Sequence, residues 1–117
     1  MKLLYVEDEI QVREGTGTFL NKFFDNLTIA IDGQDGLEKF QKSLDFDIVM
    51  TDLNMPGLNG MQMIESIKEL KKDIIVVYFS ADEVLDSIVE DEKTYIVKKP
   101  VAIEKFVEML EKIGGRI

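Results

Sequence analysis

Three carboxylates, a hydroxyl and a lysine each follow a short apolar run in this sequence, at the point where a predicted strand ends. The carboxylates belong to Glu7, Asp8 and Asp52, and the other two groups belong to Ser80 and Lys99. Acids gathered in one cleft repel one another, and a divalent cation removes that repulsion. Oxygen ligands without His or Cys suit Mg²⁺, or Mn²⁺ in its place, better than Zn²⁺. The pattern therefore predicts a magnesium site.

The same side chains could also hold a phosphoryl group. Lys99 would supply positive charge and Ser80 a hydroxyl donor, so that together with the cation they form a pocket for a tetrahedral dianion beside Asp52. An aspartate in that position is a candidate nucleophile that forms an acyl phosphate.

Each of these residues also has a simpler structural interpretation. Asp52 could start the turn that contains Pro56 and Gly57. Glu7 and Asp8 could be acids that stabilise a helix N-terminus, and a serine before a helix is commonly its N-cap. The catalytic interpretation is favoured because all of these residues come at predicted strand ends.

The composition limits the chemistry that is available. The 117 residues suffice for one domain, and the absence of Cys and His excludes disulfides, thiolate or imidazole metal sites, and a nucleophile activated by histidine. The net charge of −9 disfavours nucleic acid as a direct partner but is compatible with divalent cations and basic proteins. No apolar stretch is long enough to span a membrane and no signal peptide is apparent, so we expect a cytoplasmic location.

Five short apolar runs alternate with five segments of helical periodicity, which indicates parallel strands with right-handed crossovers and helices on both faces. We expect an α/β fold in which a doubly wound, five-stranded parallel sheet of order 2-1-3-4-5 carries five helices, as in flavodoxin-like proteins. Residues 1–117 show no second domain, so we expect a single domain without an output domain. The predicted strands are 2–6, 27–31, 48–50, 74–79 and 95–97, and the predicted helices are 10–24, 34–43, 60–71, 82–89 and 103–113.

Taken in order, these motifs resemble those of a two-component response-regulator receiver domain, of the stand-alone kind found among chemotaxis regulators. The resemblance covers nearly the whole chain. Each motif alone is weak, but the series at successive strand ends is highly specific. The matching motifs are Glu7-Asp8, Asp52 with Asn54-Met55-Pro56-Gly57 and Gly60, Ser80-Ala81, and Lys99-Pro100.

The resemblance implies a role for each site residue. Asp52 would accept a phosphoryl group from a histidine kinase or phosphotransfer protein. Asp8, Asp52 and the backbone carbonyl of Asn54 would bind Mg²⁺, with Glu7 acting through water. Lys99 would bridge the acids at rest and the phosphate afterwards.

The resemblance also implies how the signal would leave the site. Ser80 would move toward the phosphate and alter the surface of the fourth helix, fifth strand and fifth helix for a downstream protein. The chain would then catalyse only its own phosphorylation and dephosphorylation, without contacting nucleic acid or membrane directly. Pro100 is expected to follow a cis peptide bond.

Two departures affect the output surface. Lys99 comes only 19 positions after Ser80, which predicts a short or irregular fourth helix. The family's aromatic switch residue usually precedes the lysine by three positions, where this chain has Ile96; Tyr95 would fit only if Lys98 were the active-site lysine. Because adjacent strand residues face opposite sides, only one of the two lysines can point into the site, and Lys99 is favoured since it precedes Pro100.

Three other functions compete with the phospho-accepting switch. A non-phosphorylated interaction module is favoured slightly by the departures, but the intact acidic site argues against it. A metal-dependent phosphatase usually needs a second acid two residues after the nucleophile, where Asn54 stands. A flavin-binding protein of this fold would need a hydroxyl-rich loop after the first strand, where acids stand instead.

Overall fold

The structure is a computed structural model that describes residues 1–80 and 93–114. The predicted helix 82–89 lies outside these residues, as does Ala81.

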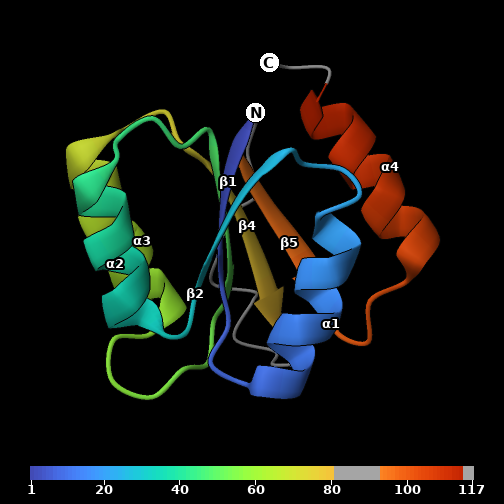
Figure 1. The fold of residues 1–117 in the computed structure, drawn as a ribbon, viewed down its shortest axis with the longest axis horizontal. Coiled ribbons are helices and arrows are strands. Elements are labelled where there is room, and N and C mark those ends of the chain that lie inside the picture. The colour runs from blue at the N-terminus through green and yellow to red at the C-terminus, as the bar shows by residue number, and fades with distance from the viewer. Residues whose placement is uncertain (81–92, 115–117) are drawn as a thin grey trace.

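A five-stranded parallel sheet forms the centre of the molecule, in the order β2-β1-β3-β4-β5 (Figure 1). This confirms the predicted fold class and strand order. All of β3 and all of β4 are buried, as expected for strands covered on both faces. The strands are β1 (Lys2–Val6), β2 (Asn26–Ala30), β3 (Ile48–Asp52), β4 (Ile75–Ser80) and β5 (Thr94–Lys98).

Helices cover both faces of the sheet. In Figure 1, α2 and α3 lie on one side of the strands and α1 and α4 on the other. Among the described residues there are four helices, which correspond to four of the five predicted. Their bounds are α1 (Ile10–Leu20), α2 (Gly33–Lys42), α3 (Gly60–Leu70) and α4 (Ile103–Gly114).

The alternation of side chains along each strand divides the apolar core into two layers. On β1, Leu4 and Val6 belong to the layer under α2 and α3, whereas Leu3 and Tyr5 belong to the layer under α1 and α4. Each layer buries apolar surface against one pair of helices, which is the main stabilising contribution in a fold of this kind.

The helix predicted over 10–24 is shorter in the structure, where α1 ends at Leu20. The backbone amides of Phe23 and Phe24 both donate to the carbonyl of Leu20 in a turn. Phe24 is buried in the core although it lies beyond the helix. Its apolar character, which extended the helical pattern in the sequence, thus reflects the packing of a turn.

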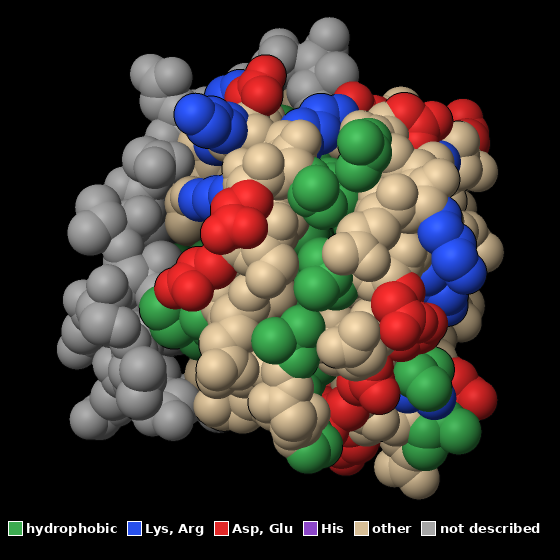
Figure 2. All heavy atoms as spheres, turned by 90° about the vertical axis from the view of Figure 1, so that its left-hand side faces the viewer, with side chains coloured by type: hydrophobic (Ala, Val, Ile, Leu, Met, Phe, Trp, Pro, Cys, Tyr) green, Lys and Arg blue, Asp and Glu red, His purple; other side chains and the backbone are tan. Residues whose placement is uncertain are grey.

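Apolar side chains also reach the surface on the face formed by α2 and α3. Figure 2 shows them as a band between charged groups. Leu44, after α2, and Leu70, at the end of α3, are each nearly half exposed. Isolated exposure of this kind is common in globular proteins and carries no functional conclusion.

Two local features fix the approach to the site. Gly57 has a φ of 75°, so the turn after β3 uses the conformational freedom of glycine, as its sequence predicted. Asn59 then begins α3 with a capping box: its side chain accepts from the amide of Gln62, whose side chain accepts from the amide of Asn59. The turn inside the loop from β3 to α3 and the start of α3 are thus each determined by a local feature of the sequence.

Candidate functional site

Three carboxylates converge at the carboxyl end of the sheet. Glu7 and Asp8 directly follow β1, Asp52 is the last residue of β3, and β1 and β3 are neighbours. One carboxylate oxygen from each lies within 4.8 Å of the others. Glu7 and Asp52 are buried, while Asp8 is the most open to solvent. A cluster of oxygen donors with one solvent-facing member is suited to a hydrated Mg²⁺.

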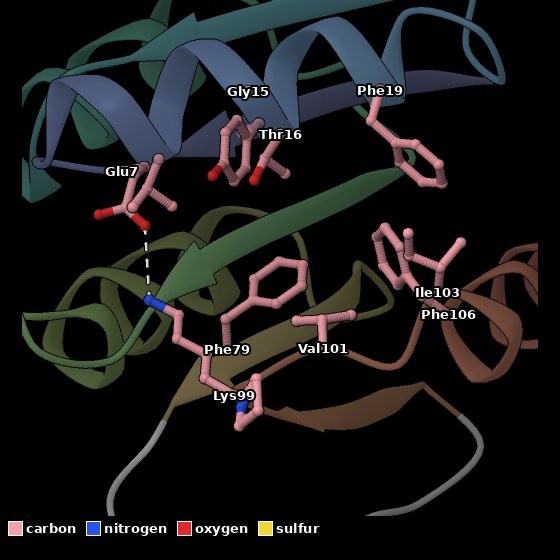
Figure 3. A pocket seen from close by; sticks show the side chains of 12 residues that line it. Glu7, Gly15, Thr16, Phe19, Phe79, Lys99, Val101, Ile103 and Phe106 are labelled. Atoms are coloured by element: carbon pink, nitrogen blue, oxygen red, sulfur yellow. Dashed lines mark ion pairs between the residues drawn. The ribbon is translucent and has the colours of Figure 1, made fainter.

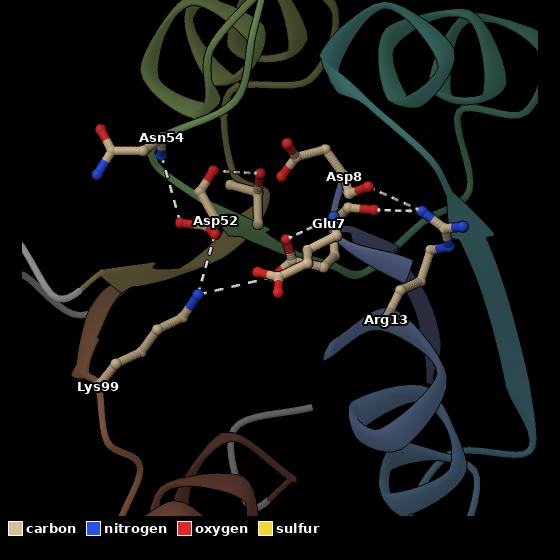
Figure 4. Close-up of polar contacts among 8 residues, drawn as sticks. Glu7, Asp8, Arg13, Asp52, Asn54 and Lys99 are labelled. Carbon is tan, nitrogen blue, oxygen red and sulfur yellow. Dashed lines mark hydrogen bonds and ion pairs between the residues drawn. The ribbon is translucent and has the colours of Figure 1, made fainter. Parts of the chain in front are cut away.

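Lys99 is the lysine that reaches these acids. Its ammonium lies 3.0 Å from Asp52 Oδ2 and 3.7 Å from Glu7 Oε1 (Figure 4). Lys98 ends β5, where it pairs with Ser80, and its side chain lines a groove formed with α4. The Lys99-Pro100 peptide bond is cis, which confirms that prediction.

Asp52 is held by groups on both of its oxygens. Oδ1 accepts the backbone amide of Asn54 at 3.3 Å, while Oδ2 accepts from Lys99. The carboxylate is therefore oriented from the turn on one side and from β5 on the other. Coordination of a metal by the Asn54 carbonyl remains a prediction.

Glu7 is an acid that the fold makes difficult to ionise. Its side chain is only 2% exposed. Burial raises the pKa of Glu7, and the negative charge of Asp52 raises it further. The hydrogen bond from the amide of Glu9 and the positive charge of Lys99 lower the pKa in part, which leaves it at about 7. Partial burial lowers the pKa of Lys99, but the hydrogen bond and charge of Asp52 outweigh it, so this pKa lies above its usual value. Lys99 therefore remains charged at neutral pH.

Ser80 lies at the same edge of the sheet, as the last residue of β4. It is buried, and its carbonyl accepts the backbone amide of Lys99 at 3.0 Å. Since β4 is the neighbour of β3, Ser80 is next to the strand that carries Asp52. Its proposed movement toward a phosphate remains a prediction.

The contribution of Arg13 was not predicted from the sequence. Its guanidinium donates to the carbonyls of Glu7 at 3.0 Å and Asp8 at 3.3 Å (Figure 4). Arg13 thus fixes the backbone that presents the two acids. Its partners are carbonyl oxygens, which every residue has, so no side-chain motif could reveal the contact. The only signal was the position of Arg13 one helical turn into α1, from which its side chain can reach back to the acids that precede the helix.

The residue three positions before Lys99 is Ile96, which packs against the core layer under α2 and α3. Tyr95 is buried in the opposite layer, under α1 and α4. The position of the family's aromatic switch residue is therefore aliphatic in this chain.

Comparison with known proteins agrees with this geometry. The family model of the response regulator receiver domain matches residues 3–111. The chain belongs to this family. It is 34% identical to chemotaxis protein CheY-3 of Vibrio cholerae over 100% of its own length and 94% of that protein. It is 39% identical to response regulator RR06 of Streptococcus pneumoniae over 93 residues, which are 78% of this chain but only 42% of RR06.

Solved structures show the same fold. A receiver domain protein from Clostridium thermocellum superposes with a TM-score of 0.86 at 24% identity, covering 98% of this chain and 94% of the other. Chemotaxis protein CheY4 of Vibrio cholerae gives a TM-score of 0.79 at 22% identity, with 96% and 97% covered. As a receiver domain, the chain is a component of two-component signalling.

Among its described residues, no helix has the length and apolarity needed to cross a bilayer.

Proposed function

We propose that this receiver domain is a phospho-accepting switch in which Asp52 is the acceptor. The observation that carries the proposal is the placement of Asp52: a buried carboxylate with a lysine 3.0 Å away and two further acids beside it. A histidine kinase or phosphotransfer protein would supply the phosphoryl group, and a downstream protein would read the result.

In this reaction the protein would contribute mainly by positioning the attacking carboxylate and by stabilising charge on the phosphoryl group. An oxygen of Asp52 attacks phosphorus, the bond from phosphorus to the donor breaks, and its electron pair leaves with the donor, so that an acyl phosphate forms. Asn54 and Lys99 hold the attacking carboxylate in place. Mg²⁺, held by Asp8, Asp52 and the Asn54 carbonyl with Glu7 acting through water, would supply positive charge for the phosphate oxygens.

Lys99 would link the chemistry to the surface. At rest its ammonium pairs with Asp52 and Glu7. Phosphorylation adds about −1.5 to −2 charge at Asp52, which would draw Lys99 and the hydroxyl of Ser80 toward the phosphate. Because both residues lie where β4 and β5 end, this movement would alter the surface around β5.

The test is the intact mass of the protein after incubation with Mg²⁺ and acetyl phosphate as the donor. We expect one phosphoryl group on the wild-type protein, removable by hydroxylamine as an acyl phosphate is. Asp52→Asn should acquire none, and chelation of Mg²⁺ should prevent the reaction.

Two outcomes would contradict the proposal. Equal phosphorylation of Asp52→Asn would place the acceptor elsewhere. A folded wild-type protein that binds Mg²⁺ but acquires no phosphoryl group, from acetyl phosphate or from a phosphorylated histidine kinase, would favour a non-phosphorylated interaction module.

A further inference from the structure

β2 is an edge strand, because it pairs with β1 on one side and has no neighbouring strand among the described residues on the other (Figure 1). The amide of Glu7 donates to the carbonyl of Ala30 at 3.2 Å, so the backbone groups of Ala30 point toward β1. Backbone groups alternate in direction along a strand, and those of Ile29 and Ile31 therefore point away from β1. A free edge of this kind is a template for pairing with another strand.

Two side chains of α2 bond to these outward groups. The ammonium of Lys39 donates to the carbonyl of Ile29 at 2.7 Å. The carboxylate of Asp35 accepts the amide of Ile31 at 3.0 Å and pairs with Lys39 at 3.1 Å. A neighbouring strand would bond to the same two backbone groups, with an N–H in place of the ammonium and a C=O in place of the carboxylate. The ion pair therefore occupies the position of a further strand.

The first turn of α2 holds this ion pair in place. The side chain of Asp32, the N-cap of the helix, accepts the amide of Asp35 at 2.7 Å. Lys39 follows Asp35 by four residues, so both side chains lie on the same side of α2. Partial burial raises the pKa of Asp35, but its hydrogen bonds from Ile31 and Lys39 lower it by more, which leaves the pKa below its usual value. The carboxylate is thus ionised at neutral pH.

The exposure of the ion pair indicates a role other than stability. The side chain of Lys39 is 39% exposed and that of Asp35 is 26% exposed. Exposed ion pairs between residues four positions apart on a helix stabilise proteins little. Charged side chains at the edge of a sheet are instead a common device against pairing between molecules.

Without the ion pair, the edge would offer apolar surface as well as free backbone groups. Ile29 is 37% exposed and Ile31 is 54% exposed, and both are β-branched, a residue type enriched in strands. The edge is also complementary to itself, since a two-fold rotation places β2 against another β2 as antiparallel strands. A second copy of the chain is therefore the partner that this edge fits.

We propose that the ion pair of Asp35 and Lys39 closes the free edge of β2, and that its removal lets β2 pair with β2 of a second copy. This edge is opposite to β5 in the sheet. The proposal does not depend on phosphorylation of Asp52.

The test measures association of the full chain by sedimentation equilibrium. Asp35→Ala combined with Lys39→Met removes both bonds to the edge and leaves the net charge at −9, because one acid and one base are lost. We expect this double variant to form a dimer with a dissociation constant on the order of 0.1 mM, and wild type to be monomeric at the same concentration. Lys39→Met alone, which keeps Asp35 in the first turn of α2, should form the same dimer about tenfold more weakly.

Two further variants are controls. Glu38→Ala combined with Lys42→Met makes the same changes at the same spacing on α2 and also preserves the net charge. Both residues are exposed, and neither bonds to β2 in the described part of the chain. This control should be monomeric. Lys39→Arg should be monomeric as well, because the guanidinium retains a charged donor.

Amide hydrogen exchange locates the interface. The amides of Leu27 and Ile29 point away from β1, so their exchange in the double variant should slow as the concentration rises and the dimer forms. The amides of Thr28 and Ala30, which face β1, should change little.

Three results would overturn the proposal. The first is a double variant that is folded but still monomeric at about 1 mM. The second is equal association of the double variant and either the wild type or the control on α2, which would remove the role of the ion pair. The third is a dimer in which the amides of Leu27 and Ile29 exchange as fast as in the monomer, which would place the interface elsewhere.

Discussion

Gly60 lies directly behind Asp52, so that a Cβ built on it would come within 2.4 Å of the backbone carbonyl oxygen of Asp52. The amide of Gly60 also donates to the carbonyl of Leu53 at 3.1 Å. The first residue of α3 is thus packed against the end of β3. The position of the Asp52 backbone depends on the absence of a side chain at residue 60.

Gly60→Ala should therefore lower the free energy of unfolding by about 1–3 kcal/mol, because backbone rather than a flexible side chain blocks the added methyl group. The control is Gly15→Ala, whose added methyl meets no neighbour and should stabilise α1 by about 0.5–1 kcal/mol. Chemical denaturation of both variants measures the difference. Equal stability of Gly60→Ala and wild type would contradict the close approach seen here.

Removal of the Lys99 charge should tighten magnesium binding. The ammonium lies 3.0 Å from Asp52 and repels a cation at the same acids. Without it, the dissociation constant for Mg²⁺ should fall by about threefold to tenfold, the range expected for one nearby charge at an intermediate effective dielectric constant. Titration of Lys99→Met with Mg²⁺ measures the change.

Lys98→Met is the matched control for this experiment, since it removes the same charge one residue away. Its side chain lines the groove beside α4 instead of the acidic cluster. Its magnesium affinity should stay close to that of wild type. A larger effect from Lys98→Met than from Lys99→Met would reverse the assignment of the two lysines.

The site could be predicted from the sequence because its residues follow apolar runs. Once the apolar runs that precede Glu7 and Asp52 were interpreted as parallel strands, the acids that follow them had to meet at one edge of the sheet. The alternation of side chains could not by itself decide between Lys98 and Lys99, because it shows that they face opposite sides without showing which side is the site. The contact of Lys99 with Asp52 resolves this.

Features that depend on packing between distant elements were not predictable. A cavity of about 370 Å³ beside Gly15 is lined by residues from α1, from β1 and β4, and from the segment after β5 (Figure 3), and no local pattern encodes how these distant segments meet. The end of α1 was misplaced for a related reason: Phe24 is apolar because a turn buries it, and a turn that contributes to the core has the same residue types as a helix face.

Stability should fall as the pH rises from about 5 to 8 in the absence of Mg²⁺. The folded-state pKa of Glu7 is about 7, above the ordinary value of 4.5, so the unfolded chain releases this proton first and the folded state binds more protons across this range. Each pH unit between the two values should cost at most about 1.4 kcal/mol. The chain has no histidine, so few other side chains change charge there.

Thermal unfolding at several pH values measures this dependence. Glu7→Gln should show a flatter profile and be more stable than wild type at pH 8, because the buried amide has no charge to desolvate. A wild-type protein whose stability is constant or rises from pH 5 to 8 would show that burial does not raise the pKa of Glu7.

Magnesium should reverse this loss of stability, because it binds the ionised acids of the folded state. At a concentration about ten times its dissociation constant, Mg²⁺ should stabilise the protein by about 1.4 kcal/mol at pH 8, and by less at pH 5.5, where Glu7 is protonated. Asp8→Asn should abolish the stabilisation, since it replaces the most solvent-open carboxylate of the cluster with a neutral amide. Asp25→Asn, the same change at an exposed residue outside the cluster, should retain it. Equal stabilisation of the two variants would mean that Mg²⁺ acts by general screening of the acidic surface, and the cluster would lose its role as a specific metal site.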